Sequence, residues 1–132
     1  MNRPFCELYL LIDHPSIDPD EISKQLKLAP QLTQKKGQST QAGYNHRYKW
    51  NKWQHIVEIN EQDNLEQYLQ ELVVHLETHE EYIQTLGSSG GFLRIFFRAS
   101  NAPVIKTEID HVVLQSLGRL GVKFGFEFFN WV

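Results

Sequence analysis

The stretch Phe5–Asp13, FCELYLLID, alternates along its length with a period of two residues. This period is typical of a β-strand that buries one face, because successive side chains of a strand point to opposite sides. The apolar side of the stretch carries Cys6, Leu8, Leu10 and Ile12. A strand with one covered face belongs to a sheet that other elements cover from one side.

The regions after this strand carry the signals of alternating helices and strands. Asp18 and Pro19 form a helix start, and Pro30 ends that helix. Asp63 with Glu66 predicts the start of a long helix over residues 64–85, with Gly87 as its C-terminal cap. The apolar stripe of that helix is Leu65, Leu69, Leu72, Leu76, Ile83 and Leu86. The remaining predicted elements are extended segments at 32–38, 48–59, 92–100 and 122–132, and a helix opened by Thr107 with Asp110 and ended by Gly121.

The strand at 48–59 changes phase between its tryptophans. Trp50 and Trp53 are three residues apart, so they cannot share one face of a regular strand. We therefore predict a β-bulge between them, because one extra residue turns every later side chain to the opposite face. Which of the two tryptophans is buried stays open.

The predicted order of elements is β-α-β-β-α-β-α-β, without a linker or an internal repeat. This order predicts one α+β domain over residues 1–132. We expect a two-layer sandwich that is ferredoxin-like in part, with helices on one face of a mostly antiparallel sheet of about five strands.

Composition limits the class of protein. No apolar run reaches the roughly 18 residues that span a bilayer, and the N-terminal residues lack the pattern of a secretion signal. One cysteine in 132 residues excludes an internal disulfide and suits a reducing compartment. We expect a cytoplasmic protein with no membrane contact.

The net charge of −3 hides two blocks of opposite sign. Residues 22–52 carry seven basic side chains and no acidic one, and residues 53–93 carry eight acidic side chains and no Lys or Arg. Such polarity steers binding partners, unless the fold brings the two blocks together so that they neutralise each other.

Several segments of the chain resemble the bacterial domain-of-unknown-function 4279 family (DUF4279). The resemblance covers residues 8–129 and is carried most specifically by Asp18–Ile22, Lys36–Gly37, Trp50 and Leu120–Gly121. It implies a compact domain of α-helices and β-strands with no established activity. It also implies a possible immunity role, in which the protein neutralises a cognate bacterial toxin by binding it. The family supplies no catalytic residue to carry over.

The sequence contains no arrangement of residues that predicts a reaction. Lys35–Lys36–Gly37 lacks the order of a phosphate-binding loop, which needs glycine before lysine and a helix after it. His75 and His79 share a helix flank, but Glu77 lies roughly 160° around the helix from both, so no metalloprotease motif forms. We predict no enzyme, no catalytic residue, no cofactor and no metal site.

The sequence therefore favours a binding function. The first hypothesis is a protein partner, such as a toxin domain, held by an acidic helix face and an exposed tryptophan; its residues are Glu66, Gln70, Glu77, Glu81, Trp50 and Trp53. The alternative is a nucleic-acid or nucleotide module that stacks bases on alternating aromatic and basic residues; its residues are Phe92, Arg94, Phe96, Arg98, Lys35 and Lys36. The negative net charge, and acids such as Glu7 and Glu127 that can pair with the arginines, disfavour the alternative.

Overall fold

The alternating stretch forms the central strand of the sheet in the computed structural model, which describes residues 6–37, 49–60, 63–100 and 106–129. The elements are β1 (Cys6–His14), α1 (Pro19–Leu26), β2 (Leu32–Gln34), β3 (Asn51–Ile59), α2 (Leu65–Glu77), α3 (Glu80–Ser88), β4 (Phe92–Ser100), α4 (His111–Leu120) and β5 (Lys123–Phe129).

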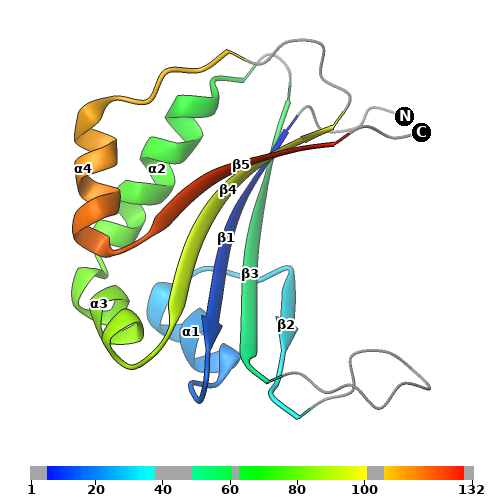
Figure 1. Ribbon diagram of the computed structural model, residues 1–132, viewed down its shortest axis with the longest axis vertical. Helices are drawn as coiled ribbons and strands as arrows, with labels where there is room; N and C mark the ends of the chain where they lie inside the picture. Colours follow the sequence, from blue (N-terminus) through cyan, green and yellow to red (C-terminus); the bar gives the residue numbers. More distant parts are fainter. Residues whose placement is uncertain (1–5, 38–48, 61–62, 101–105, 130–132) are drawn as a thin grey trace.

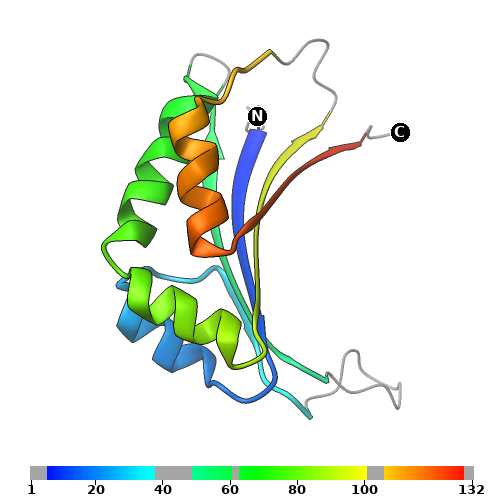
Figure 2. The same cartoon turned by 60° about the vertical axis from the view of Figure 1, so that its left-hand side comes forward.

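The sheet has the strand order β2-β3-β1-β4-β5. Neighbouring strands are antiparallel except β4 and β5, which run parallel and are joined through α4. The helices lie on one face of the sheet (Figure 1 and Figure 2). This confirms the predicted α+β class, with five strands and the helices on one face.

The core lies between this sheet and the helices. Leu10 and Ile12 of β1 have no exposed surface, and their neighbours Ile95 and Trp53 on the adjoining strands are equally buried. The helices contribute the predicted apolar stripe, all of it buried. Because each large apolar side chain contributes about 1.5–3 kcal/mol when it is buried, this layer decides which face the helices cover.

The first helix begins with the predicted cap, Asp18, whereas the last helix begins at His111 and not at Thr107 as predicted, because Asp110 is its cap. The Asp18 carboxylate accepts a hydrogen bond from the backbone N–H of Asp20 (2.8 Å), and Pro19 opens α1. The Asp110 carboxylate accepts from the N–H of Val112 (3.0 Å), so α4 starts directly after Asp110. These caps satisfy N–H groups that the helix itself leaves without an acceptor.

The prediction of one helix over residues 64–85 is wrong. α2 ends at Glu77 and α3 begins at Glu80, with non-helical dihedral angles at His79 (φ −120°, ψ 30°). The Thr78 hydroxyl donates to the carbonyl of His75 (2.6 Å), a local bond that competes with continued helix formation. The break changes the direction of the chain so that Ile83 also packs into the core.

Two of the predicted caps are also corrected. Asn64, not Asp63, caps α2, because its side-chain oxygen accepts from the N–H of Gln67 (3.2 Å). Asp63 instead accepts from the N–H of Asn60 (3.0 Å). Gly87 lies inside α3, and Gly90, with φ +101°, supplies the left-handed turn into β4.

The predicted bulge between the tryptophans is wrong. β3 pairs with β1 residue for residue, from Asn51 opposite His14 to Ile59 opposite Cys6. Trp53 is fully buried and donates its indole N–H to the Ser23 hydroxyl (2.9 Å). The two tryptophans have different phases because they belong to opposite faces of the sheet.

Candidate functional site

The face of the sheet turned away from the helices is not covered by any described element (Figure 2). We call it the open face. Its central side chains are partly exposed apolar groups, and charged groups lie toward both ends of the strands. The central apolar members are Leu11 of β1, Ile56 of β3 and Phe96 of β4, and the exposed Phe92 lies at the start of β4. An apolar centre with a polar rim is the usual anatomy of a protein interface.

One end of the open face holds a pocket of about 270 Å³, lined by Asp13, Trp50, Phe92, Arg94 and Lys123. We call this pocket the aromatic corner. The rings of Trp50 and Phe92 meet edge to face with centroids 5.5 Å apart, and the Lys123 ammonium lies 5.9 Å from the Phe92 ring centre. Three strands and the residue before β3 therefore place two aromatic rings beside two cations.

Arg94 is held in the aromatic corner by an ion pair. Its Nη2 lies 3.1 Å from a carboxylate oxygen of Asp13, which faces it diagonally across the antiparallel pair β1–β4. Its Nε–H is buried and has no acceptor among the described residues. A buried donor without an acceptor costs about 1–3 kcal/mol, so Arg94 is held here at some cost in stability.

The opposite end of the open face is acidic. Arg98 there donates to the Tyr9 hydroxyl (3.0 Å) and pairs with Glu127 of β5 (3.2 Å). Burial, followed by the nearby charge of Glu7, raises the pKa of Tyr9, so its hydroxyl stays protonated. Glu58 of β3 lies directly opposite Glu7 in the register. The expected pairing of Arg98 with Glu127 is thus present.

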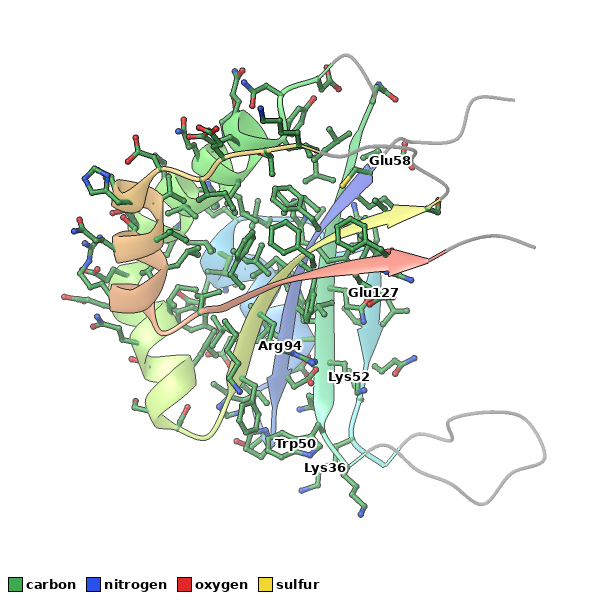
Figure 3. The ribbon with its side chains drawn as sticks, turned by 45° about the horizontal axis from the view of Figure 1, so that its top comes forward. Lys36, Trp50, Lys52, Glu58, Arg94 and Glu127 are labelled. Carbon is green, nitrogen blue, oxygen red and sulfur yellow. The ribbon has the colours of Figure 1, made fainter. Side chains whose placement is uncertain are left out.

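Charge therefore changes sign along the strands of the open face. Figure 3 shows Lys36, Lys52 and Arg94 toward the Trp50 end, while Glu58 and Glu127 lie toward the other end. Lys123 adds a further cation to the first end. The sequence order does not reveal this polarity, because each end collects residues from several strands.

The acidic helix face is partly balanced by the chain itself. Arg119 of α4 pairs with both Glu77 and Glu80, its Nε lying 2.6 Å from the Glu80 carboxylate. Gln70 donates its amide to Glu66 (2.9 Å). The sequence did not predict the two ion pairs of Arg119, because Arg119 lies about 40 residues from Glu77 and Glu80 along the chain.

The residues of the first binding hypothesis do not form one surface. Glu66, Gln70, Glu77 and Glu81 belong to the helix layer, whereas Trp50 lies on the open face. The prediction of Trp53 as a partner contact is wrong, because Trp53 is fully buried between the sheet and α1. Trp50 is the tryptophan of this pair that a partner can reach.

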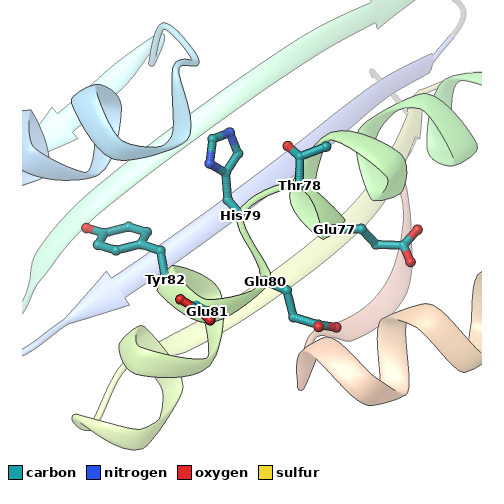
Figure 4. Close-up of a pocket in the computed structure, with 6 residues that line it drawn as sticks. All are labelled: Glu77, Thr78, His79, Glu80, Glu81 and Tyr82. Atoms are coloured by element: carbon teal, nitrogen blue, oxygen red, sulfur yellow. The ribbon is translucent and has the colours of Figure 1, made fainter.

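A second pocket, of about 430 Å³, lies at the junction of α2 and α3 (Figure 4). Its side chains diverge, with His79 and Tyr82 directed away from Glu77 and Glu80. Burial lowers the pKa of His79 and raises the pKa of Tyr82 to about 12, so the Tyr82 hydroxyl stays protonated near neutral pH. Among the described residues, no three His, Cys, Asp or Glu side chains are grouped to hold a metal ion.

The residues of the nucleic-acid alternative are only partly brought together. Phe92, Arg94, Phe96 and Arg98 share the open face, with both arginines in ion pairs. Lys35 pairs with Asp18 at the start of α1 (3.5 Å). The backbone N–H of Lys36 is held by Asn51 (2.6 Å), which fixes a turn.

Sequence reasoning missed Asp13 and Lys123, which complete the aromatic corner. The sequence could have indicated that both side chains lie on the open face, because each falls on the polar side of an alternating stretch. Their proximity depends on the parallel pairing of β4 with β5, where Lys123 lies beside Arg94. Alternation alone does not specify that pairing.

None of the described helices has the length and apolar run that spanning a membrane requires.

Comparison with known proteins identifies the family of this chain. No curated protein and no solved structure matches the chain significantly. A family described as domain of unknown function (DUF4279) matches residues 4–129, which is nearly the whole chain. The chain therefore belongs to the DUF4279 family.

Proposed function

We propose that this chain is a non-enzymatic protein-binding domain that docks its partner on the open face, with the aromatic corner as the centre of contact. The observation that supports this most is the pair of accessible rings, Trp50 and Phe92, beside Arg94. Interface residues that dominate binding energy are enriched in Trp, Tyr and Arg, and they lie in pockets that exclude water.

The charge pattern favours a protein over a nucleic acid. A nucleic-acid strand carries charge of one sign along its length, and the acidic end of the open face would repel it. A folded protein can present a positive and a negative patch that match the two ends of this face. The Arg94 side chain, 38% exposed, additionally suits a partner carboxylate.

The partner class follows from the family resemblance. An immunity-type inhibitor that binds a cognate bacterial toxin is one binder of this kind, and a toxin domain is the first partner to test. In this proposal the contact is moved from the acidic helix face to the open face, since Arg119 already pairs with Glu77 and Glu80.

The test compares two bait variants in quantitative affinity capture from the native cell. Trp50→Ala with Phe92→Ala removes both rings of the aromatic corner, and Glu66→Lys with Glu81→Lys is the matched control on the helix layer. We expect the specific partner to be retained by the parent and the control, and reduced about tenfold or more by the aromatic variant. Circular dichroism checks that each variant is folded.

Two outcomes contradict the proposal. Equal retention of every captured protein by the parent and the aromatic variant excludes the open face as the contact. Salt-sensitive micromolar binding of single-stranded RNA or DNA, measured by fluorescence anisotropy at two salt concentrations, supports the nucleic-acid alternative instead.

A further inference from the structure

The two edges of the sheet are built differently. β2, at one edge, has only three residues and is followed by Lys35 and Lys36. Short edge strands and lysines discourage pairing with another chain. β5, at the other edge, has seven residues, and no described strand lies beyond it. One edge is thus protected against further pairing, whereas β5 keeps a long row of backbone groups on its outer side.

β5 also carries an exposed aromatic ladder. Phe124, Phe126 and Phe128 alternate on the helix side of the strand, and Figure 2 shows β5 bending away from the helices toward its end. Phe126 and Phe128 are 47% and 63% exposed. Their rings stack at 6.1 Å with an angle of 4° between their planes. Two large apolar rings ordered side by side in water mark a surface that gains free energy when it is covered.

The sequence of β5 is complementary to itself. Directly opposed residues of an antiparallel pair point to the same face of the sheet. In a symmetric pair of two β5 strands, odd-numbered residues must therefore lie opposite odd-numbered ones, and the two-fold axis must pass through a residue. A two-fold axis at Gly125 places Lys123 of each copy opposite Glu127 of the other, and Phe124 of each copy opposite Phe126 of the other. Each of these cross-strand pairs therefore occurs two times in the dimer. An axis at Phe126 keeps the aromatic pairs but sets Glu127 opposite Gly125.

Charge therefore selects the register centred on Gly125. Opposite charges directly across an antiparallel pair stabilise it, and like charges destabilise it. Glu127 pairs with Arg98 within the chain, yet its side chain is 52% exposed and can also contact a second cation.

We propose that β5 pairs antiparallel with β5 of a second copy of this chain, about a two-fold axis at Gly125. The two five-stranded sheets then form one continuous sheet, in which Phe124 and Phe126 of the two copies are opposed and Phe128 packs beside them, opposite Val122 of the second copy. This surface lies at the sheet edge, away from the ring of Trp50, and it shares Lys123 with the aromatic corner.

The ladder is tested by sedimentation velocity over a range of protein concentrations. We expect a dimer for the parent and at least a tenfold weaker dimer for Phe128→Lys, which places a charge on the ladder. Val74→Lys is the matched control, because Val74 is 59% exposed and lies on α2, away from β5. A parent that stays monomeric at several hundred micromolar, or a Phe128→Lys variant that dimerises as tightly as the parent, overturns the proposal.

The register is tested by exchanging charges. Lys123→Glu alone sets two glutamates against each other in both pairs, and Glu127→Lys alone does the same with lysines. We expect each single variant to dimerise about tenfold more weakly than the parent, and an equimolar mixture of the two to recover dimers, because every pair is then opposite in sign. A single variant that dimerises like the parent, or a mixture that recovers nothing, overturns the proposal whether or not a partner binds the open face.

Discussion

His14 shows how much structure one buried side chain can hold. Its Nδ1 accepts hydrogen bonds from the N–H groups of Ser16 (3.0 Å) and Ile17 (2.9 Å), so the proton of the neutral ring sits on Nε2. That nitrogen lies 2.8 Å from the Ser89 hydroxyl at the end of α3. One ring thus joins the turn after β1 to a helix 75 residues later. Burial lowers the pKa of this ring, against a smaller opposite effect of Glu21.

This lowered pKa predicts acid sensitivity. The unfolded chain binds a proton at His14 near the ordinary pKa of about 6.5, whereas the folded chain binds it only at lower pH. The free energy of unfolding should therefore fall as pH drops below about 6.5 and stop falling below the folded pKa. Urea denaturation at several pH values between 5 and 7.5 measures this slope.

His14→Asn is the control for that slope. The asparagine side-chain oxygen can take the place of Nδ1 in the turn, but it does not titrate. We expect a shallower pH dependence in this variant, with a remainder from His79, whose pKa burial also lowers. An unchanged slope in His14→Asn would show that other groups cause the acid sensitivity.

At the scale of the element, two helices end in the same backbone conformation with different residues. Lys27, with φ +56°, is the C-terminal cap of α1, and Gly121, with φ +73°, is the C-terminal cap of α4. The left-handed region costs a residue with a side chain about 1 kcal/mol, while glycine enters it freely. The prediction that Gly121 ends the last helix is confirmed, and Lys27 takes the same conformation without being glycine.

Two substitutions should change stability in opposite directions. Lys27→Gly relieves the strain at the end of α1 and should raise the free energy of unfolding by up to about 1 kcal/mol. Gly121→Ala introduces that strain into α4 and should lower it by about 1 kcal/mol. An added side-chain carbon at Gly121 would meet no atom within 4 Å, so the loss measures backbone strain alone. Chemical denaturation of both variants checks the signs, and a stabilised Gly121→Ala would refute the explanation.

At the scale of the whole molecule, the sheet separates a face that stabilises the fold from a face that is available for binding. Trp53 lies in the core against α1, and Trp50 lies in the aromatic corner. Most acids of the acidic block belong to α2 and α3, where Arg119, which lies outside the basic block, pairs with Glu77 and Glu80. The open face acquires a polarity of its own, from Lys52 and Glu58 of the two blocks together with Arg94, Lys123 and Glu127 outside them.

Trp53→Ala should therefore lower the free energy of unfolding much more than Trp50→Ala does. Removing a fully buried indole costs about 3–5 kcal/mol, a large part of the 5–15 kcal/mol that stabilises a typical domain. Removing the partly exposed Trp50 should cost less than about 1 kcal/mol, because its main described contact is with Phe92. Urea unfolding curves decide the point. Equal losses would place Trp50 in the core as well and would weaken the proposed open-face contact.

The sequence by itself determined the features that depend on neighbouring residues. Alternation in β1, the cap Asp18 and the apolar stripe of the long helical region were all readable, because period and capping chemistry act within a few residues. These local signals were enough for the α+β class and for the layer that forms the core.

Only the tertiary structure decided the features that depend on contacts between distant segments. The burial of Trp53 instead of Trp50 and the pairing of Arg119 with Glu77 each join regions far apart in the chain. The aromatic corner and the long β5 edge arise from strand order, which alternation leaves undetermined. The physical reason is that free energy is gained across the whole packed molecule, so a local pattern can be satisfied by several different pairings.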